Sequence, residues 1–341
     1  MSRVLAVRLD SLGDVLVTGP AVRALAGAAE HLTLLCGPRG RAAAELLPGV
    51  DEVLCWRAPW VDPDPEPVRR DHVEDLRAAL AARRFDRAVV FTSFHQSPLP
   101  TALVLRLAGI AWVGAICEDY PGSLLDVRHR LPDDLPEPER ALSLAAACGA
   151  RLPPGDDGRL AVRGVAAQAA LAPEPPYVVL HPGTSVPARA WPPDRFRETC
   201  RRLVDGGHRV VVTGAPGERG LTARVAGASG ALDLGGRTDL AGLASVLAHA
   251  RAVVVGNTGP AHLAAAVGTP VVSLFAPTVP AERWAPYGVP RVLLGDQTAP
   301  CRDSRATVCP VPGHPCLASV TPDDVLSAVG AFSAPPVAEP A

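Results

Sequence analysis

Two carboxylates stand close together near the start of the chain, in the segment RLDSLGD. Asp10 and Asp14 flank Gly13 just after an apolar run at residues 4–9. A carboxylate at the end of a buried strand can take a proton from a reacting hydroxyl, which is general base chemistry. Asp14 should also lie near the N-terminus of the next helix, where the helix dipole favours its ionised form. The alternative interpretation is a plain helix cap.

The second half of the chain offers groups that suit phosphate and ribose. In the segment HPGTSVPARAWP, Thr184 and Ser185 supply hydroxyl and backbone donors, and Arg189 supplies a permanent planar cation. The alternative is an ordinary loop with a surface arginine. In the segment GAPGE, Glu218 can accept hydrogen bonds from ribose hydroxyls or simply occupy the first turn of a helix.

A third segment, NTGPAH, has the form of an anion site at a helix N-terminus. Thr258 is a helix cap candidate, Gly259 lets a ligand approach the backbone, and His262 follows within the first turn. A lone helical histidine is more often structural. Asn257 is the only asparagine in the chain, which points to a specific role for it.

Two further patterns resemble metal sites but do not fit one. Asp62 and Asp64 form an Asp-x-Asp spacing inside a Pro-rich loop, where solvated carboxylates are the better interpretation. Near the C-terminus three cysteines and a histidine are spaced too widely for the short paired ligands of structural zinc: Cys301, Cys309, His314 and Cys316. We therefore expect no metal and no cofactor.

Short apolar runs alternate with Ala-, Leu- and Arg-rich helical stretches, a pattern that indicates parallel sheets. The predicted strands are 4–9, 32–36, 53–56, 87–92, 177–181, 209–213, 232–234, 252–256 and 271–275. The predicted helices include 15–29, 40–47, 73–84, 194–205, 239–249 with Thr238 as its cap, and a last one capped by Thr321. The sequence thus predicts an α/β fold of two doubly wound, Rossmann-like domains facing a central cleft, at 1–165 and 172–332, with a disordered tail at 333–341.

Composition excludes several classes of protein. The 341 residues carry a net charge of −2, which argues against a nucleic-acid-coating surface. All 33 basic residues are Arg, so neither a Schiff-base lysine nor a Walker lysine exists. The eight cysteines form no C-x-x-C pair and are expected to be reduced thiols of a cytoplasmic protein. No signal peptide and no run of about 20 apolar residues is present, which leaves only peripheral membrane contact open.

Taken together, these segments resemble glycosyltransferase family 9, the ADP-heptose:lipopolysaccharide heptosyltransferases. The resemblance is carried by RLDSLGDVLVTGPAVRAL, HPGTSVPARAWP, GAPGE, the long segment through VVVGNTGPAHLAAAVGTPVVSLFAPT, and HPCLASVTPDDV, in order and at fitting spacing. It implies a GT-B fold, with the acceptor bound by the N-terminal domain and the nucleotide sugar by the C-terminal domain. It also implies an inverting, metal-independent transfer.

The family pattern also implies roles for single residues. Asp14 matches the general base, Glu218 the ribose contact, and the phosphate contacts are matched by Thr184, Ser185, Arg189, Thr258, Gly259 and His262. Arg189 stands where the family commonly has Lys, and Asn257 stands where it usually has Asp. The change at Asn257 keeps an acceptor oxygen but removes a charge, so it bears on nucleotide identity and affinity rather than on the fold.

The function expected from the sequence is transfer of a sugar, heptose by family default, from an ADP-sugar to a glycan or glycolipid hydroxyl. The expected setting is the cytoplasm, with contact at the inner face of the cell membrane left open. Two other functions remain: a GT-B-like nucleotide-sugar epimerase or hydrolase, and a non-catalytic nucleotide-sugar-binding protein. A dinucleotide-dependent enzyme is disfavoured because no Gly-x-Gly-x-x-Gly follows the first strand.

Overall fold

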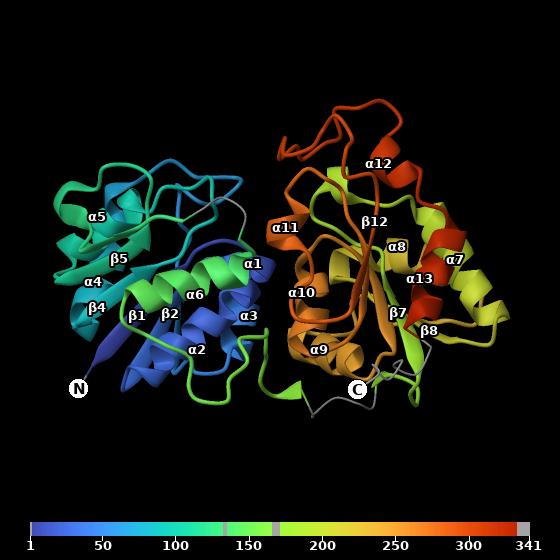
Figure 1. Ribbon diagram of the computed structural model, residues 1–341, viewed down its shortest axis with the longest axis horizontal. Helices are drawn as coiled ribbons and strands as arrows, with labels where there is room; N and C mark the ends of the chain where they lie inside the picture. Colours follow the sequence, from blue (N-terminus) through green and yellow to red (C-terminus); the bar gives the residue numbers. More distant parts are fainter. Residues whose placement is uncertain (1, 132–134, 166–170, 333–341) are drawn as a thin grey trace, which may run out of the picture. The chain divides into compact units, whose positions relative to one another are not determined.

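The computed structural model describes residues 2–131, 135–165 and 171–332. The expected disordered tail at 333–341 lies outside the described residues. The chain divides into two compact units, Met1–Arg163 and Gly164–Ala341. The domains expected from the sequence were 1–165 and 172–332. Each unit is a parallel sheet with helices on both faces (Figure 1).

The first unit is built on a six-stranded parallel sheet in the order β3-β2-β1-β4-β5-β6. Its strands are β1 (Arg3–Arg8), β2 (His31–Cys36), β3 (Glu52–Cys55), β4 (Arg87–Val90), β5 (Trp112–Ile116) and β6 (Val127–His129). The chain winds outward from β1 to one edge and then returns to the other side of β1 as β4. The ends of β1 and β4 therefore form the switch point at which such sheets bind ligands.

Helices α2 (Gly19–Gly27) and α6 (Glu137–Ala147) pack together in this unit, as do α4 (Arg70–Arg83) and α5 (Leu99–Leu107). The prediction of a single helix at 15–29 is wrong. The segment forms two helices, α1 (Leu12–Val17) and α2. The break occurs because Pro20 has no N–H to donate to the carbonyl of Leu16 and instead lies in the N-terminal turn of the second helix. Helix α3 (Arg41–Leu46) and one-turn 3₁₀ helices at Pro38–Gly40 and Gly122–Leu124 complete the unit.

The second unit repeats the same winding. Its order is β12-β11-β10-β7-β8-β9, with β7 (Tyr177–His181), β8 (Arg209–Val212), β9 (Leu232–Asp233), β10 (Ala252–Gly256), β11 (Val271–Leu274) and β12 (Arg291–Leu294). The switch point here lies between the ends of β7 and β10. Strands β7 and β10 are buried along their whole length and apolar except for His181 at the end of β7, as expected for central parallel strands covered on both faces.

Helices cover both faces of the second sheet. In Figure 1 helices α9 (Leu240–Ala248), α10 (Gly259–Ala266) and α11 (Ala281–Trp284) lie on one side, and α7 (Pro193–Asp205), α8 (Arg219–Ala226) and α13 (Pro322–Ala331) on the other. Helix α12 is Pro315–Ala318, and 3₁₀ turns stand at Pro187–Arg189 and Pro216–Glu218. Thr321 caps α13 as expected. The cap of α9 is Asp239, which accepts from the Gly242 N–H at 2.7 Å, and not Thr238.

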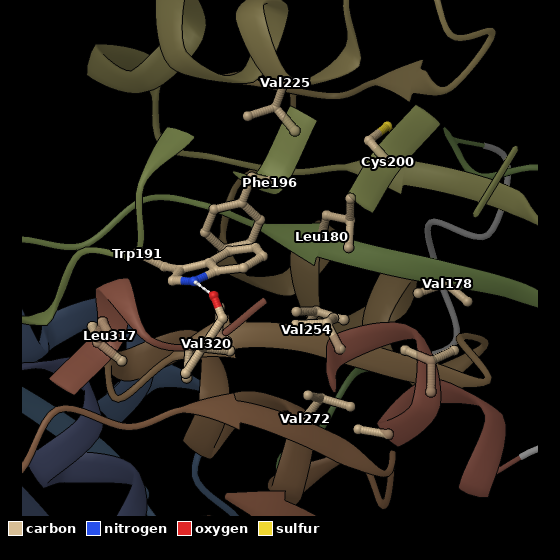
Figure 2. Close-up of a cluster of buried hydrophobic side chains, with 14 of the residues drawn as sticks. Val178, Leu180, Trp191, Phe196, Cys200, Val225, Val254, Val272, Leu317 and Val320 are labelled. Atoms are coloured by element: carbon tan, nitrogen blue, oxygen red, sulfur yellow. Dashed lines mark hydrogen bonds between the residues drawn. The ribbon is translucent and has the colours of Figure 1, made fainter. Parts of the chain in front are cut away.

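A buried cluster anchors the loop that follows β7. The Trp191 ring packs edge-on against Phe196 of α7, with ring centroids 4.8 Å apart, and its indole N–H donates to the Val320 carbonyl at 3.2 Å (Figure 2). Leu180, Val254 and Val272 of the sheet complete the contact surface. Because Trp191 is buried and hydrogen-bonded, it fixes the end of this loop, and Arg189 lies only two residues before it. None of the described helices has the length and apolar character that crossing a membrane requires.

Candidate active site

Asp14 lies at the switch point of the first unit, in the first turn of α1. One carboxylate oxygen, Oδ2, accepts from the backbone N–H of Ser11 at 3.1 Å, so part of its role is that of a helix cap. The other oxygen, Oδ1, accepts from the Arg8 guanidinium at 3.0 Å and lies 3.4 Å from the Ser93 hydroxyl. A fifth of the side chain, 19%, remains exposed. The cap interpretation and a reactive role are thus compatible in one residue.

Asp10 lies deeper than Asp14 and has a different electrostatic setting. Its carboxylate pairs with the Arg8 Nε at 2.8 Å and accepts from the Gln96 side chain. Burial, only partly offset by Arg8, raises the pKa of Asp10 to about 6. Of the two carboxylates, Asp14 is the more exposed, at 19% against 9% for Asp10, so it is the better placed to meet a ligand.

Sequence reasoning missed four residues of this cluster. Arg8 ends β1, Ser93 and Gln96 follow β4, and Glu137 belongs to α6. A signal for Arg8 was present, since a charged residue at the end of an otherwise apolar central strand must have buried partners. Nothing in the sequence marked the others, because the loop after β4 and helix α6 reach Arg8 and Asp10 only in the folded unit.

The corresponding switch point of the second unit brings together Arg189 and the N-terminus of α10. The Arg189 guanidinium donates to the Asn257 carbonyl at 3.3 Å. Asn257 is 6% exposed; its amide nitrogen donates to the Ala276 carbonyl at 3.4 Å, and its Oδ1 has no hydrogen-bond partner among the described residues. A fixed cation, a helix N-terminus and an unused buried acceptor therefore converge at one place, which suits an anionic ligand with a donor group.

The other residues predicted for this site are also located at the strand ends. Thr258 takes the N-cap position of α10, but its hydroxyl makes no capping bond, and Gly259 is the first helical residue. His262 is buried, with its ring centroid 6.4 Å from that of Trp284. Thr184 uses its hydroxyl within its own turn, accepting from the Val186 N–H at 3.2 Å, and Ser185 is exposed.

Glu218 reaches across to the loop after β7. Its Oε2 accepts from the Ala215 N–H at 2.8 Å, and the carboxylate packs directly against Gly183, where even one methyl group would overlap it. Beside it, the buried His181 ring bonds to the Thr213 hydroxyl at 2.9 Å, and burial lowers its pKa to about 4. The loops after β7 and β8 thus meet, with the carboxylate held at their junction.

The two patterns that resembled metal sites have other local roles. Asp62 accepts from the Asp64 backbone N–H at 3.0 Å, which is a turn contact within its loop. His314 bonds to the Ala188 carbonyl at 3.0 Å and so supports the turn that carries Arg189. Among the described residues, no three His, Cys, Asp or Glu side chains are grouped to hold one metal ion.

Comparison with known proteins identifies the family. The family model for glycosyltransferase family 9 (heptosyltransferase) matches residues 73–313, more than half of the chain. The chain belongs to glycosyltransferase family 9. The matched residues include parts of both units, and membership of this family makes the chain a glycosyltransferase.

Curated members of family 9 support the assignment. Lipopolysaccharide heptosyltransferase 1 of Escherichia coli is 30% identical over 296 residues, 82% of this chain and 87% of the relative. The enzyme of the same name from Pseudomonas aeruginosa is 39% identical over a shorter stretch of 141 residues, 40% of this chain and 39% of that protein.

Solved structures of the family share the fold. ADP-heptose lps heptosyltransferase II of E. coli matches with a TM-score of 0.76 at 22% identity, covering 97% of this chain and 98% of that one. An E. coli heptosyltransferase solved with ADP matches with a TM-score of 0.69 at 24% identity, covering 97% and 98%. The expected GT-B architecture, two Rossmann-like folds in one chain, is confirmed.

Proposed function

We propose that this family 9 enzyme is an inverting, metal-independent heptosyltransferase that uses ADP-heptose and a lipopolysaccharide-type glycolipid hydroxyl, with Asp14 as general base. The observation that carries the proposal is the division of chemistry between two switch points. One gathers carboxylates around the buried Arg8 and leaves Asp14 partly exposed, and the other gathers the Arg189 guanidinium, a helix N-terminus and a buried acceptor oxygen. The relatives are named lipopolysaccharide heptosyltransferases, and one was solved with ADP.

The chemical steps follow from these groups. Asp14 takes the proton of the acceptor hydroxyl while that oxygen forms a bond to the anomeric carbon of the donor. The bond from that carbon to the diphosphate breaks on the opposite face, and ADP leaves with the electron pair. Arg189 and the N-terminus of α10 stabilise the negative charge that develops on the diphosphate, the role a metal has in other transferases.

We place donor binding in the second unit, through Thr184, Ser185, Arg189, Asn257, Thr258, Gly259 and His262, with Glu218 on the ribose. Acceptor binding then belongs to the first unit, beside Asp14. A glycolipid acceptor would be presented at a membrane, so we place the enzyme in the cytoplasm at the inner face of the cell membrane. No cofactor is required in this scheme.

The test of the function is turnover of ADP-heptose with and without an acceptor. The purified protein is incubated with ADP-heptose alone and with heptose-free lipopolysaccharide core, and ADP and glycosylated product are both measured. We expect ADP release to depend on acceptor and to match product formation. Acceptor-independent ADP release or an isomerised donor would instead identify a hydrolase or epimerase, and binding without turnover a non-catalytic protein.

Changing Asn257 to Asp tests whether its buried oxygen faces the donor. The substitution adds a negative charge beside the proposed diphosphate site, so we expect Asn257→Asp to change the affinity for ADP and ADP-heptose several-fold while leaving adenosine affinity unaltered. Titration calorimetry with the three ligands measures this. An equal change in affinity for ADP, ADP-heptose and adenosine would show that Asn257 has only a structural role, its hydrogen bond to the Ala276 carbonyl.

Changing Gly183 to Ala tests the position of Glu218. The new methyl group overlaps the carboxylate and displaces it, so we expect about tenfold weaker ADP binding, the loss of one hydrogen bond to a charged group. The unmutated protein should prefer ADP to its deoxyribose analogue, and Gly183→Ala should lose that preference. Gly217→Ala is the matched control, because an added methyl there meets nothing within 4 Å. Unchanged discrimination in Gly183→Ala would remove Glu218 from the ribose site.

A further inference from the structure

Arg8 is among the largest fully buried side chains of the protein, at 2% exposure. Its guanidinium is surrounded by carboxylates: Nε pairs with Asp10 at 2.8 Å, Nη2 with Asp14 at 3.0 Å, and Nη1 lies 3.9 Å from Glu137. Nη2 also donates to the Ser93 hydroxyl at 3.0 Å. Every guanidinium nitrogen thus faces a carboxylate, two of them from the segment that follows β1 and one from α6.

Helix α6 fixes this group from a distant part of the chain. Glu137, 2% exposed, lies between Arg8 and Arg140, whose Nη1 is 3.6 Å from the same carboxylate oxygen. Arg140 also donates to the Thr92 carbonyl at 2.7 Å, which joins the helix to the loop after β4. The guanidinium is therefore held by three segments: the β1–α1 loop, the β4–α5 loop and α6.

Stability alone does not account for such a cluster. Taking several charges out of water costs free energy that pairing seldom repays, and apolar residues of similar volume usually serve as well or better. Buried charge networks next to an exposed carboxylate are instead typical of sites that fix a reactive group. Asp14 is the member of this network that keeps 19% of its side chain exposed.

We propose that Arg8 is the positioning residue of Asp14. It holds Oδ1 while the Ser11 N–H holds Oδ2, so the carboxylate is fixed at both oxygens and turns its exposed edge to the acceptor hydroxyl. This inference rests on the proposed role of Asp14 as base. Helix α6, through Glu137, keeps the guanidinium in place.

A pH profile reads this role directly, because donors to the ionised form of a carboxylate favour that form. The charged groups that face the cluster are Asp10, Glu137 and Arg140. Two other helices pack on α1, and their charged residues pair elsewhere. Arg41 and Glu45 of α3 pair with each other at the surface, and Arg23 of α2 pairs with Asp156. Removing the Arg8 contact should therefore move the acid limb of the kcat–pH profile to higher pH.

The decisive variant is Arg8→Lys, which keeps the charge but loses the multiple contacts of the guanidinium. We expect a fold and an ADP affinity like those of the unmutated enzyme, a kcat lower by about 10–100-fold, as when an orienting partner is lost, little change in acceptor KM, and the shifted acid limb. Arg23→Lys is the matched control, since Arg23 makes a two-point contact with Asp156 at 2.6 and 2.8 Å in the same unit. It should leave kcat and the pH profile unchanged.

A second variant keeps the test decisive if Arg8→Lys does not fold. The double variant Arg8→Gln/Glu137→Gln removes one buried charge of each sign and should shift the acid limb in the same direction. A lowered melting temperature with normal kcat and pH profile would overturn the positioning role and leave Arg8 a structural residue. Asp14→Asn, measured alongside, separates the two ideas: if it stays active, the base assignment itself fails, and the role of Arg8 with it.

Discussion

Asp14→Asn is expected to lose turnover by about 10²–10⁴-fold while binding ADP normally. That range is typical for a positioned general base, and Asn cannot accept the proton of the acceptor hydroxyl. ADP affinity should be unaffected because the proposed nucleotide contacts all belong to the second unit. Steady-state transfer, ADP titration and melting temperature on the one variant provide the measurement.

The contacts of Asp14 determine what the stability measurement should show. Its two oxygens accept from the Ser11 N–H and from Arg8, and Asn offers only one oxygen, so one contact is lost. We expect a moderate cost in the free energy of unfolding, about 1–3 kcal/mol. Asp156→Asn is the matched control, because Asp156 makes a similar part-buried pair with Arg23. It should lower stability comparably and leave turnover intact.

The opposite pattern would identify Asp14 as a cap. A melting temperature reduced to the level of Asp156→Asn, together with near-normal transfer, would remove Asp14 from the mechanism. Asp10 would then be the next candidate for the base, although its burial, at 9% exposure, favours a supporting role.

Arg189→Ala is expected to weaken donor binding and to slow transfer. The diphosphate carries its charge in both the ground state and the transition state, so the loss of one charge-assisted contact should cost about 1.5–3 kcal/mol in donor affinity. Transfer should fall further at saturating donor, because negative charge grows on the leaving diphosphate. ADP and adenosine affinities and kcat are the quantities to measure.

A control separates this charge effect from loss of a loop contact. Arg189 donates to the Asn257 carbonyl and so supports the loop before α10; Arg189→Lys keeps the cation and should recover part of the affinity. Arg201→Ala removes an exposed guanidinium from the same unit, one that pairs with Asp205 on α7, and should change nothing. Equal affinity of the unmutated protein for adenosine and ADP would show that no phosphate site exists at Arg189.

The central strands could be located from the sequence almost to the residue. The observed β7 and β10 are the predicted 177–181 and 252–256, because strands buried on both faces are rich in apolar residues, and their ends are marked by the polar loops that follow. The site loops follow from the same rule, since ligands bind at the carboxyl ends of parallel strands. Family motifs then supplied roles for the individual residues.

Elements of the first unit were harder to predict. Helix α6 begins in the segment LPEPER, where prolines and acids indicate a loop, yet Pro138 occupies the first turn and Glu137 and Glu139 lie at the positive end of the helix dipole. Strand β6 has only three residues, all half-buried, and carries no apolar run. Local pattern reports the environment of an element only when that element is long enough to show a period.

By itself, the sequence determined the α/β class and the doubly wound architecture, and it predicted the loops proposed to carry the chemistry, with Asp14 as the candidate base. Only the tertiary structure decided the surroundings of that base. Arg8 and Glu137 are separated by most of the first unit in sequence, and they lie together because α6 packs against α1 and α2, which follow β1. The physical reason is that a charge can be buried only where partners from several segments converge, and convergence depends on the topology of the whole unit rather than on any local pattern.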